Sequence, residues 1–126
     1  MNSVSARAGI ILFAHGSRDP AWAKPMQAIA DLIRQKQVDV PVQCAYLELM
    51  SPNLAACAAE MVAAGAASIR VMPLFLGIGK HVKDDLPELI KSLRENHPAV
   101  NFSLLPTIGE DQRVLQLMAE IALDQA

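Results

Sequence analysis

The sequence predicts an α/β protein with a parallel four-stranded sheet and helices on both of its faces. Four apolar runs alternate along the 126 residues with four segments that have the periodicity of an amphipathic helix. The first run, residues 9–14 (GIILFA), is hydrophobic almost throughout, as in a strand that a parallel sheet buries on both faces. Hydrophobic residues make up 52% of the chain, which is enough for one core. We therefore expect one domain over residues 1–126 with right-handed crossovers.

The first helix is expected after this strand, over residues 19–36. Asp19 is a candidate N-cap, and Pro20 suits the first helical position. An apolar face follows at spacings of four, three and four residues, formed by Trp22, Met26, Ile29 and Ile33. These side chains are predicted to pack on the sheet.

The second strand and the second helix are expected at residues 42–49 (VQCAYLEL) and 51–65. Ser51 is a candidate N-cap with Pro52 behind it. Gly65 is typical of the position just after a helix C-terminus.

The second half of the chain repeats the alternation. Residues 68–76 (SIRVMPLFL) predict the third strand, and residues 87–96 predict a helix with an apolar side of Leu86, Leu89, Ile90 and Leu93. Residues 100–105 (VNFSLL) alternate like an edge strand, and residues 110–125 predict a last helix with Val114, Leu117, Met118 and Ile121 aligned. Because the first and third runs are the most hydrophobic, we place them centrally, which gives the flavodoxin-like strand order 2-1-3-4.

In an open α/β sheet the ligand crevice lies beyond the carboxyl ends of the strands, where the strand order reverses. Here that point lies between residues 14–20 (AHGSRDP) and residues 77–85 (GIGKHVKDD), which carry His15 and His81. Glu48 ends the second strand and is expected at the same crevice. Imidazole and carboxylate suit cobalt, iron, nickel or zinc, and three ligands leave positions open for a substrate. The pattern predicts a metal site formed by His15, Glu48 and His81.

Other interpretations of these residues stay open on spacing alone. Histidines at strand ends also bind phosphate, donate hydrogen bonds or act as bases. Glu48 is equally well explained as a solvated carboxylate or as a cap of the following helix. His97 precedes Pro98 at a predicted helix end, where contact with terminal carbonyls or solvent is expected, so it is left out of the site.

Three motifs in this order, AHGSRDP, YLELMSP and PLFLGIGKHVKDDLP, resemble those of the small class II chelatases, the sirohydrochlorin cobaltochelatase and ferrochelatase family in its short CbiX-like form. The likeness spans nearly the whole chain. It implies a chelatase-like fold and an enzyme that inserts a divalent metal into sirohydrochlorin or a related tetrapyrrole, without ATP, in cobalamin or sirohaem biosynthesis. Cobalt and iron are the expected metals, with nickel as a further candidate. His15 and His81 match the family's metal-binding and catalytic histidines, and Glu48 matches an acidic position of the second motif.

The resemblance also implies the partners. Short members of the family pair as homodimers, whereas longer members contain two such domains. The metal is a substrate, and no permanently bound cofactor is expected. Because this class of tetrapyrrole carries many carboxylates, we expect Arg18, Lys80 and Lys83 to bind it, with Ser17 as a further anion contact. Solvated loop lysines are the alternative interpretation.

Metal insertion requires two pyrrole protons to leave as the ion enters the macrocycle. A positioned histidine or carboxylate accepts them while another residue holds the ion. His15 and His81 are expected to share or divide these tasks, and the sequence does not assign them.

Composition and charge argue against several other classes of protein. A formal net charge of −2 argues against a general surface for nucleic acid or anionic membrane. No apolar stretch approaches the roughly 20 residues that span a bilayer, and the opening residues show no cleavable leader pattern. Cys44 and Cys57 have neither a CxxC nor a metal-ligand spacing and are interpreted as buried hydrophobes. A cytoplasmic enzyme is the resulting expectation.

Two other functions remain as alternatives. A histidine-dependent phosphotransfer enzyme would use His15 as its nucleophile, but AHGSR lacks the arginine directly before the histidine that is typical of histidine phosphatases. A non-catalytic carrier of metal or tetrapyrrole is the other, since a fold alone proves no activity.

Overall fold

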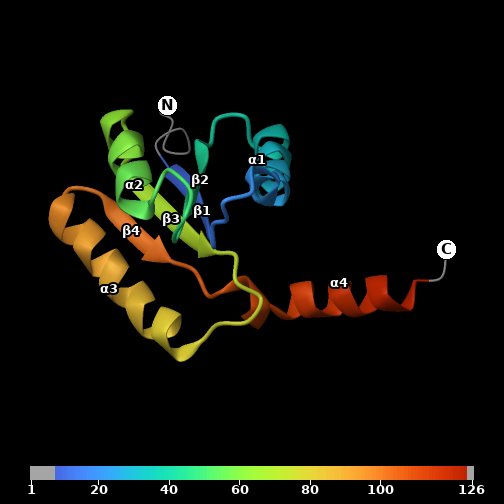
Figure 1. Cartoon of the computed structure of the whole chain (residues 1–126). Helices are drawn as coiled ribbons and strands as arrows, with labels where there is room; N and C mark the ends of the chain where they lie inside the picture. Colours follow the sequence, from blue (N-terminus) through green and yellow to red (C-terminus); the bar gives the residue numbers. More distant parts are fainter. Residues whose placement is uncertain (1–7, 125–126) are drawn as a thin grey trace.

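The computed structural model describes residues 8–124, which form a four-stranded parallel sheet in the order β2-β1-β3-β4 (Figure 1). The strands are β1 (Ala8–Ala14), β2 (Val42–Tyr46), β3 (Ser68–Pro73) and β4 (Asn101–Leu104). The predicted order is confirmed, with the first and third apolar runs in the centre. Residues 1–7, to which the expectation about a leader refers, lie outside the described residues.

Helices alternate with the strands along the described chain. They are α1 (Lys24–Lys36), α2 (Leu54–Ala63), α3 (Lys80–Asn96) and α4 (Gln112–Leu123), with short 3-10 helices η2 (Pro20–Ala23) and η3 (Ile108–Glu110). Figure 1 shows α1 on one face of the sheet and α2 and α3 on the other. Within residues 8–124, no helix combines the length and the apolar character that crossing a bilayer requires.

The central strand β1 is buried on both faces, as its continuous hydrophobic run predicts. Successive side chains of a strand point to opposite faces, so β1 contributes to two clusters of buried residues. The cluster under α2 and α3 includes Ile11, Phe13, Ile69, Val71 and Phe102. The cluster under α1 includes Leu12, Ala14, Met26, Ala30 and Cys44. Each fully buried Val, Leu, Ile, Phe or Met side chain among them contributes roughly 1.5–3 kcal/mol.

The start of α1 differs from the prediction. Asp19 is an N-cap, but it caps η2 by accepting a hydrogen bond from the Ala21 N–H at 2.9 Å. Pro25 has no N–H to donate to a preceding carbonyl, so the α-helix begins only at Lys24. The placement of Trp22 on the packed face of the helix was wrong, because 49% of its surface is exposed.

The start of α2 also lies later than expected. The Pro52 carbonyl accepts a hydrogen bond from the Tyr46 N–H at 2.9 Å, which keeps Pro52 beside β2. The N-cap is therefore Asn53, which accepts from the Ala56 N–H at 2.8 Å, and not Ser51. The predicted stop is confirmed, since Gly65 has a left-handed φ of 106°.

The third helix begins earlier than its predicted start at Pro87. It runs from Lys80, with Gly79 as N-cap, and carries Pro87 in its interior. Val82 is half-buried against the core, which extends the apolar side toward the N-terminus, while the predicted packing of Leu86, Ile90 and Leu93 is confirmed. Lys80, His81 and Lys83 consequently lie in the first turn or two of a helix instead of in a loop.

The last helix does not pack on the sheet, contrary to the prediction. No residue of α4 is buried, and Leu117 and Ile121 are 56% and 64% exposed. Figure 1 shows α4 running away from the sheet. Its first turn is built locally: Asp111 accepts from the Arg113 N–H at 2.9 Å, and hydrogen bonds from the Arg113 side chain lower the pKa of Asp111 to about 2.

The difference in burial predicts that a Leu→Ala substitution lowers the free energy of unfolding by different amounts in two helices. Leu93→Ala removes a side chain that is 3% exposed, and we expect it to lower the free energy of unfolding by about 3 kcal/mol. Leu32→Ala in α1 removes one that is 54% exposed and is expected to cost less than about 0.5 kcal/mol. Urea unfolding followed by circular dichroism measures both, and equal losses would contradict the assignment.

Candidate functional site

Backbone pairing carries three chain segments to the same edge of the sheet. Beyond the ends of the strands, the Leu47 N–H donates to the Ala14 carbonyl at 2.8 Å, and the Leu74 N–H donates to the Phe13 carbonyl at 2.7 Å. His15 and Glu48 therefore leave neighbouring strands at nearly the same height. The sequence-based placement of both residues at the carboxyl edge agrees with this geometry.

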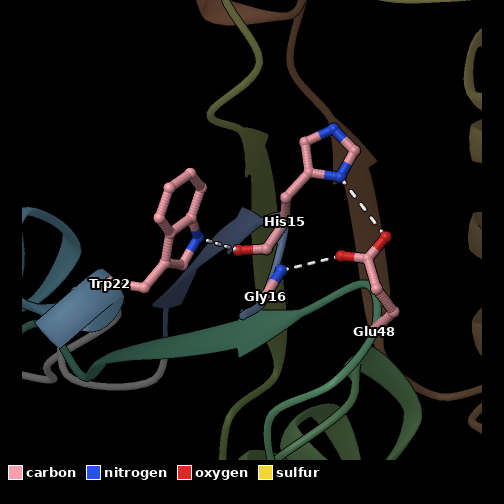
Figure 2. A network of polar contacts seen from close by, with 4 residues as sticks. All are labelled: His15, Gly16, Trp22 and Glu48. Carbon is pink, nitrogen blue, oxygen red and sulfur yellow. Dashed lines mark hydrogen bonds and ion pairs between the residues drawn. The ribbon is translucent and has the colours of Figure 1, made fainter. Parts of the chain in front are cut away.

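His15 and Glu48 form a pair at this edge (Figure 2). Nδ1 of His15 lies 3.4 Å from Oε1 of Glu48, within hydrogen-bonding range, and both side chains are about half exposed. An ionised carboxylate only accepts, so this contact places the ring proton on Nδ1. In the neutral imidazole this arrangement leaves the lone pair on Nε2, which is the form that binds a metal ion or accepts a proton.

The second oxygen of Glu48 is also engaged. The Gly16 N–H donates to Oε2 of Glu48 at 2.7 Å (Figure 2). A Cβ atom at Gly16 would overlap the backbone carbonyl of Glu48, so glycine is required for the close approach of the two loops. Next to Glu48, Leu49 has a φ of 67°, a left-handed conformation that is unfavourable for leucine. Backbone strain of this kind is concentrated at functional sites.

Two aromatic residues near His15 were not recognised as site residues from the sequence. The Trp22 indole N–H donates to the His15 carbonyl at 2.7 Å (Figure 2). The Phe75 ring lies 4.6 Å from the His15 ring, centroid to centroid, at an interplanar angle of 55°. The helical period assigned Trp22 to the core and gave no signal for this contact. Phe75 lies two residues after the end of β3 at Pro73, on the side where the ligand crevice was expected, and this position was the available signal.

Ser17 and Arg18 lie on the loop between His15 and η2. Oγ of Ser17 accepts a hydrogen bond from the Asp19 N–H at 3.0 Å, which leaves the hydroxyl proton free to donate. Arg18 is exposed on the same loop. Both residues follow His15 along the chain, and their contact with a substrate stays a prediction.

His81 does not join His15 and Glu48 in a three-residue cluster. Among residues 8–124, no group of three His, Cys, Asp or Glu side chains lies close enough together to hold a metal ion. His81 and Lys80 are exposed in the first turn of α3. The structure thus brings two of the three predicted metal ligands together, and the complete ligand set stays a prediction.

Two small cavities open near the segments that follow the strands, and one of them is lined by His15. One of about 150 Å³ is lined by His15, Trp22, Met26 and Leu74 among others. Another of about 230 Å³ lies between α3 and the segment that follows β4, and its lining includes Leu76, Lys83 and Thr107. Lys83 therefore faces a hollow next to the segment that follows β3.

The cysteines are not candidate metal ligands. Cys44 and Cys57 are free and buried. Burial raises the pKa of Cys44 and raises the pKa of Cys57 to about 12. Since the thiolate is the metal-binding form, both are confirmed as small buried hydrophobic residues.

Solved structures of similar proteins share this architecture. A cobalamin (vitamin B12) biosynthesis CbiX protein from Marinobacter aquaeolei VT8 matches with a TM-score of 0.80 and 29% identity, over 92% of this chain and 94% of that one. The sirohydrochlorin chelatase SirB from Bacillus subtilis subspecies spizizenii, in complex with cobalt, matches with a TM-score of 0.72 and 30% identity. That match covers 95% of this chain and 51% of SirB.

The parallel 2-1-3-4 sheet with flanking helices is the fold of these CbiX and SirB structures, so the fold class of the chain is that of the chelatases. A family model described as CbiX matches residues 9–125. The chain belongs to the CbiX family.

Two relatives of known activity illustrate how length varies among similar proteins. The sirohydrochlorin cobaltochelatase of Methanococcoides burtonii is 28% identical over 98% of this chain and 97% of its own length. The sirohydrochlorin ferrochelatase of Priestia megaterium is 34% identical over 88% of this chain, but the match spans only 42% of that enzyme.

The close approach at Gly16 predicts a steric effect. Gly16→Ala places a methyl group against the Glu48 backbone, and we expect a loss of about 1–3 kcal/mol in the free energy of unfolding. Gly77→Ala is the matched control, because a Cβ there meets no atom within 4 Å. Thermal and urea unfolding of the two variants measure the difference, and an unchanged Gly16→Ala protein would contradict the described packing.

Proposed function

We propose that this protein inserts a divalent metal, cobalt or iron, into sirohydrochlorin or a related tetrapyrrole, without ATP. The observation that carries the proposal is the His15–Glu48 pair at the carboxyl edge of a CbiX-family sheet. Similar proteins support the choice of substrate, since they are named sirohydrochlorin chelatases and include SirB structures with cobalt and with Fe3+. The metal is a substrate in this reaction, which belongs to cobalamin or sirohaem biosynthesis.

In this proposal Glu48 positions His15. Both carboxylate oxygens already accept hydrogen bonds, one from the His15 ring and one from the Gly16 N–H. A carboxylate bound to one ring nitrogen orients a histidine and increases the basicity of the other nitrogen. Nε2 of His15 is thus the atom that holds the incoming ion or accepts a pyrrole proton. Glu48 becomes a direct metal ligand if it releases one of its two present contacts.

Metal insertion releases two protons, so the reaction requires two proton acceptors or one proton acceptor that acts twice. A divalent cation enters the macrocycle, and the two pyrrole N–H protons leave, so the overall charge of the macrocycle complex is unchanged. We assign the role of second proton acceptor to His81, which is exposed in the first turn of α3. A positioned acid–base group of this kind typically contributes 10²–10⁴-fold to the rate.

Charged and apolar side chains are available to bind the carboxylates and the flat face of the macrocycle. Arg18 is exposed on the loop that follows His15, and Lys80 and Lys83 are exposed in the first turns of α3. We assign these three cations to the carboxylates of the macrocycle, with the Ser17 hydroxyl as an additional donor. Leu49 and Leu76 are exposed on the segments that follow β2 and β3. Together with Trp22, they offer apolar contact for the flat face of the ring.

We propose further that the working form is a homodimer in the cytoplasm and that residues 1–126 form one domain. The match covers about half of the longer SirB chain, 51%, so two copies supply the equivalent length. Two free, buried cysteines suit a reducing compartment.

A carrier of metal or tetrapyrrole is the second candidate, because the pair of His15 and Glu48 also suits binding without turnover. Absorbance separates the two functions. Incubation of the protein with sirohydrochlorin and cobalt under anaerobic conditions changes the macrocycle spectrum catalytically in a chelatase. A carrier gives at most a stoichiometric change.

The assigned role of His15 predicts the effect of its removal. His15→Ala is expected to lower the rate of metal insertion at least about 100-fold while leaving the fold intact, because it removes the acceptor atom. His81→Ala is expected to have a similar effect. Initial rates of the spectral change measure it, and circular dichroism checks the fold.

His97→Ala provides the matched control for these histidine variants. His97 is the C-cap residue of α3, at the end opposite His81, and its loss is expected to leave the rate within about twofold. Near-normal turnover by both His15→Ala and His81→Ala would rule out the histidine mechanism.

The proposed docking of carboxylates predicts a change in substrate affinity. Lys80→Ala combined with Lys83→Ala is expected to raise the KM for sirohydrochlorin about tenfold with kcat nearly unchanged, since the lost contacts act on binding. Lys91→Ala, an exposed lysine farther along α3, is the control and is expected to leave KM unchanged. A fall in kcat without a change in KM would argue against this role.

A further inference from the structure

Helix α4 carries an apolar stripe that no part of the described chain covers. Val114, Leu117, Met118 and Ile121 follow one another at spacings of three, one and three residues and therefore lie on one side of the helix. Leu117, Met118 and Ile121 are all exposed. A helix of 12 residues is marginal in water without tertiary packing, so this stripe needs a covering surface.

The segment that precedes α4 is held at the carboxyl edge of its own sheet. The Thr107 hydroxyl donates to the Phe75 carbonyl at 2.8 Å, and the Gly109 N–H donates to the same carbonyl at 3.1 Å. Gly109 also packs so closely on the Leu76 backbone that a Cβ atom would overlap it. These contacts hold the chain at the carboxyl edge, and α4 leaves from there into solvent (Figure 1).

The same molecule has an uncovered strip on the sheet. On the face that α1 partly covers, β3 presents Arg70, Met72 and Leu74, and Arg70 is paired in register with Ser103 of β4. Arg70 and Ser103 are exposed, while Met72 and Leu74 are half-buried. In a layered α/β fold, a helix is expected to cover this part of the sheet.

Hollows mark both ends of the strip. Near its amino end lies a cavity of about 520 Å³ whose lining includes Ile10, Ile33 and Arg70. Near its carboxyl end lies the cavity of about 150 Å³ that Leu74 shares with His15. A bound helix beside α1 would fill the space between them.

We infer that α4 of one copy packs on the β3 strip of a second copy, and that the exchange is reciprocal in a two-fold symmetric homodimer. Each copy offers one uncovered helix and one uncovered strip, so mutual exchange closes the assembly with no free site. The lengths agree, since α4 is about 18 Å long and a six-residue strand about 20 Å.

The opposite charges of Arg70 and Glu120 support one direction for the exchanged helix. Among residues 8–124, Arg70 forms no ion pair, and Glu120 lies beside the apolar stripe in the second half of α4. A helix that runs antiparallel to β3 brings Glu120 toward Arg70 and its own first turn toward Leu74. The partner's helix then closes the side of the cavity next to His15. This inference rests on the proposed homodimer and does not depend on the proposed metal insertion.

Interruption of the stripe tests the inference in the full-length protein. Leu117→Asp is expected to raise the dimer dissociation constant at least about 100-fold, measured by analytical ultracentrifugation. Leu123→Asp is the matched control, because Leu123 lies on the opposite side of α4, and it is expected to leave the constant unchanged. A monomeric wild-type protein would overturn both the dimer and the exchange. An intact dimer of the folded Leu117→Asp variant would overturn the exchange alone.

Disulfide trapping identifies the surface that α4 contacts. A mixture of the single variants Met72→Cys and Leu117→Cys is expected to give a cross-linked heterodimer under mild oxidation, and a mixture of Met72→Cys with Leu123→Cys is not. Cross-linking of Leu117→Cys with itself, in place of the heterodimer, would show helix-to-helix packing and overturn docking on the sheet. Cross-linking within one chain of the Met72→Cys/Leu117→Cys double variant, and not between chains, would show that α4 covers its own strip and would overturn the exchange.

Discussion

The backbone ladder at the carboxyl edge of the sheet is the constraint on which the rest of the molecule depends. β1 is paired with β2 and β3 through its last residues, and its side chains are buried in both apolar clusters. A shift of β1 by one residue would exchange the two faces of the strand and leave buried backbone groups unpaired. His15 follows directly after this fixed strand, so its backbone position is set by the core and not by its own contacts.

Glu48 orients the His15 side chain, which lies beyond the backbone hydrogen bonds of the sheet. Its carboxylate accepts hydrogen bonds from the His15 ring and from the Gly16 N–H, which come from one loop. Each contact is partly exposed and weak by itself, but together they determine which ring nitrogen is available. The absence of a side chain at Gly16 and the left-handed backbone at Leu49 are the local conditions for this arrangement.

Helices α3 and α4 show why an apolar pattern predicts a helix better than it predicts burial. Both carry apolar residues at three- and four-residue spacings, yet Leu86, Ile90 and Leu93 are buried, while no residue of α4 is. The preceding segments also differ, because Thr107 and Gly109 are hydrogen-bonded to the Phe75 carbonyl at the carboxyl edge, and α4 starts three residues farther along the chain. Periodicity defines an apolar side, but the path of the chain decides what covers it.

The sequence by itself determined the strand order, the burial of β1 on both faces and the location of His15 and Glu48 at one edge, because continuous apolar runs and parallel crossovers leave few other arrangements. The tertiary structure decided the rest. Pro87 suggested a helix start, but packing of Val82 and Leu86 extended α3 to Lys80 and placed His81 on a helix. The contact of His15 with Glu48 joins residues 33 positions apart, and the Trp22 contact follows from a 3-10 turn. The spacing of residues within one segment does not predict such contacts, since they depend on where separate strands end in space.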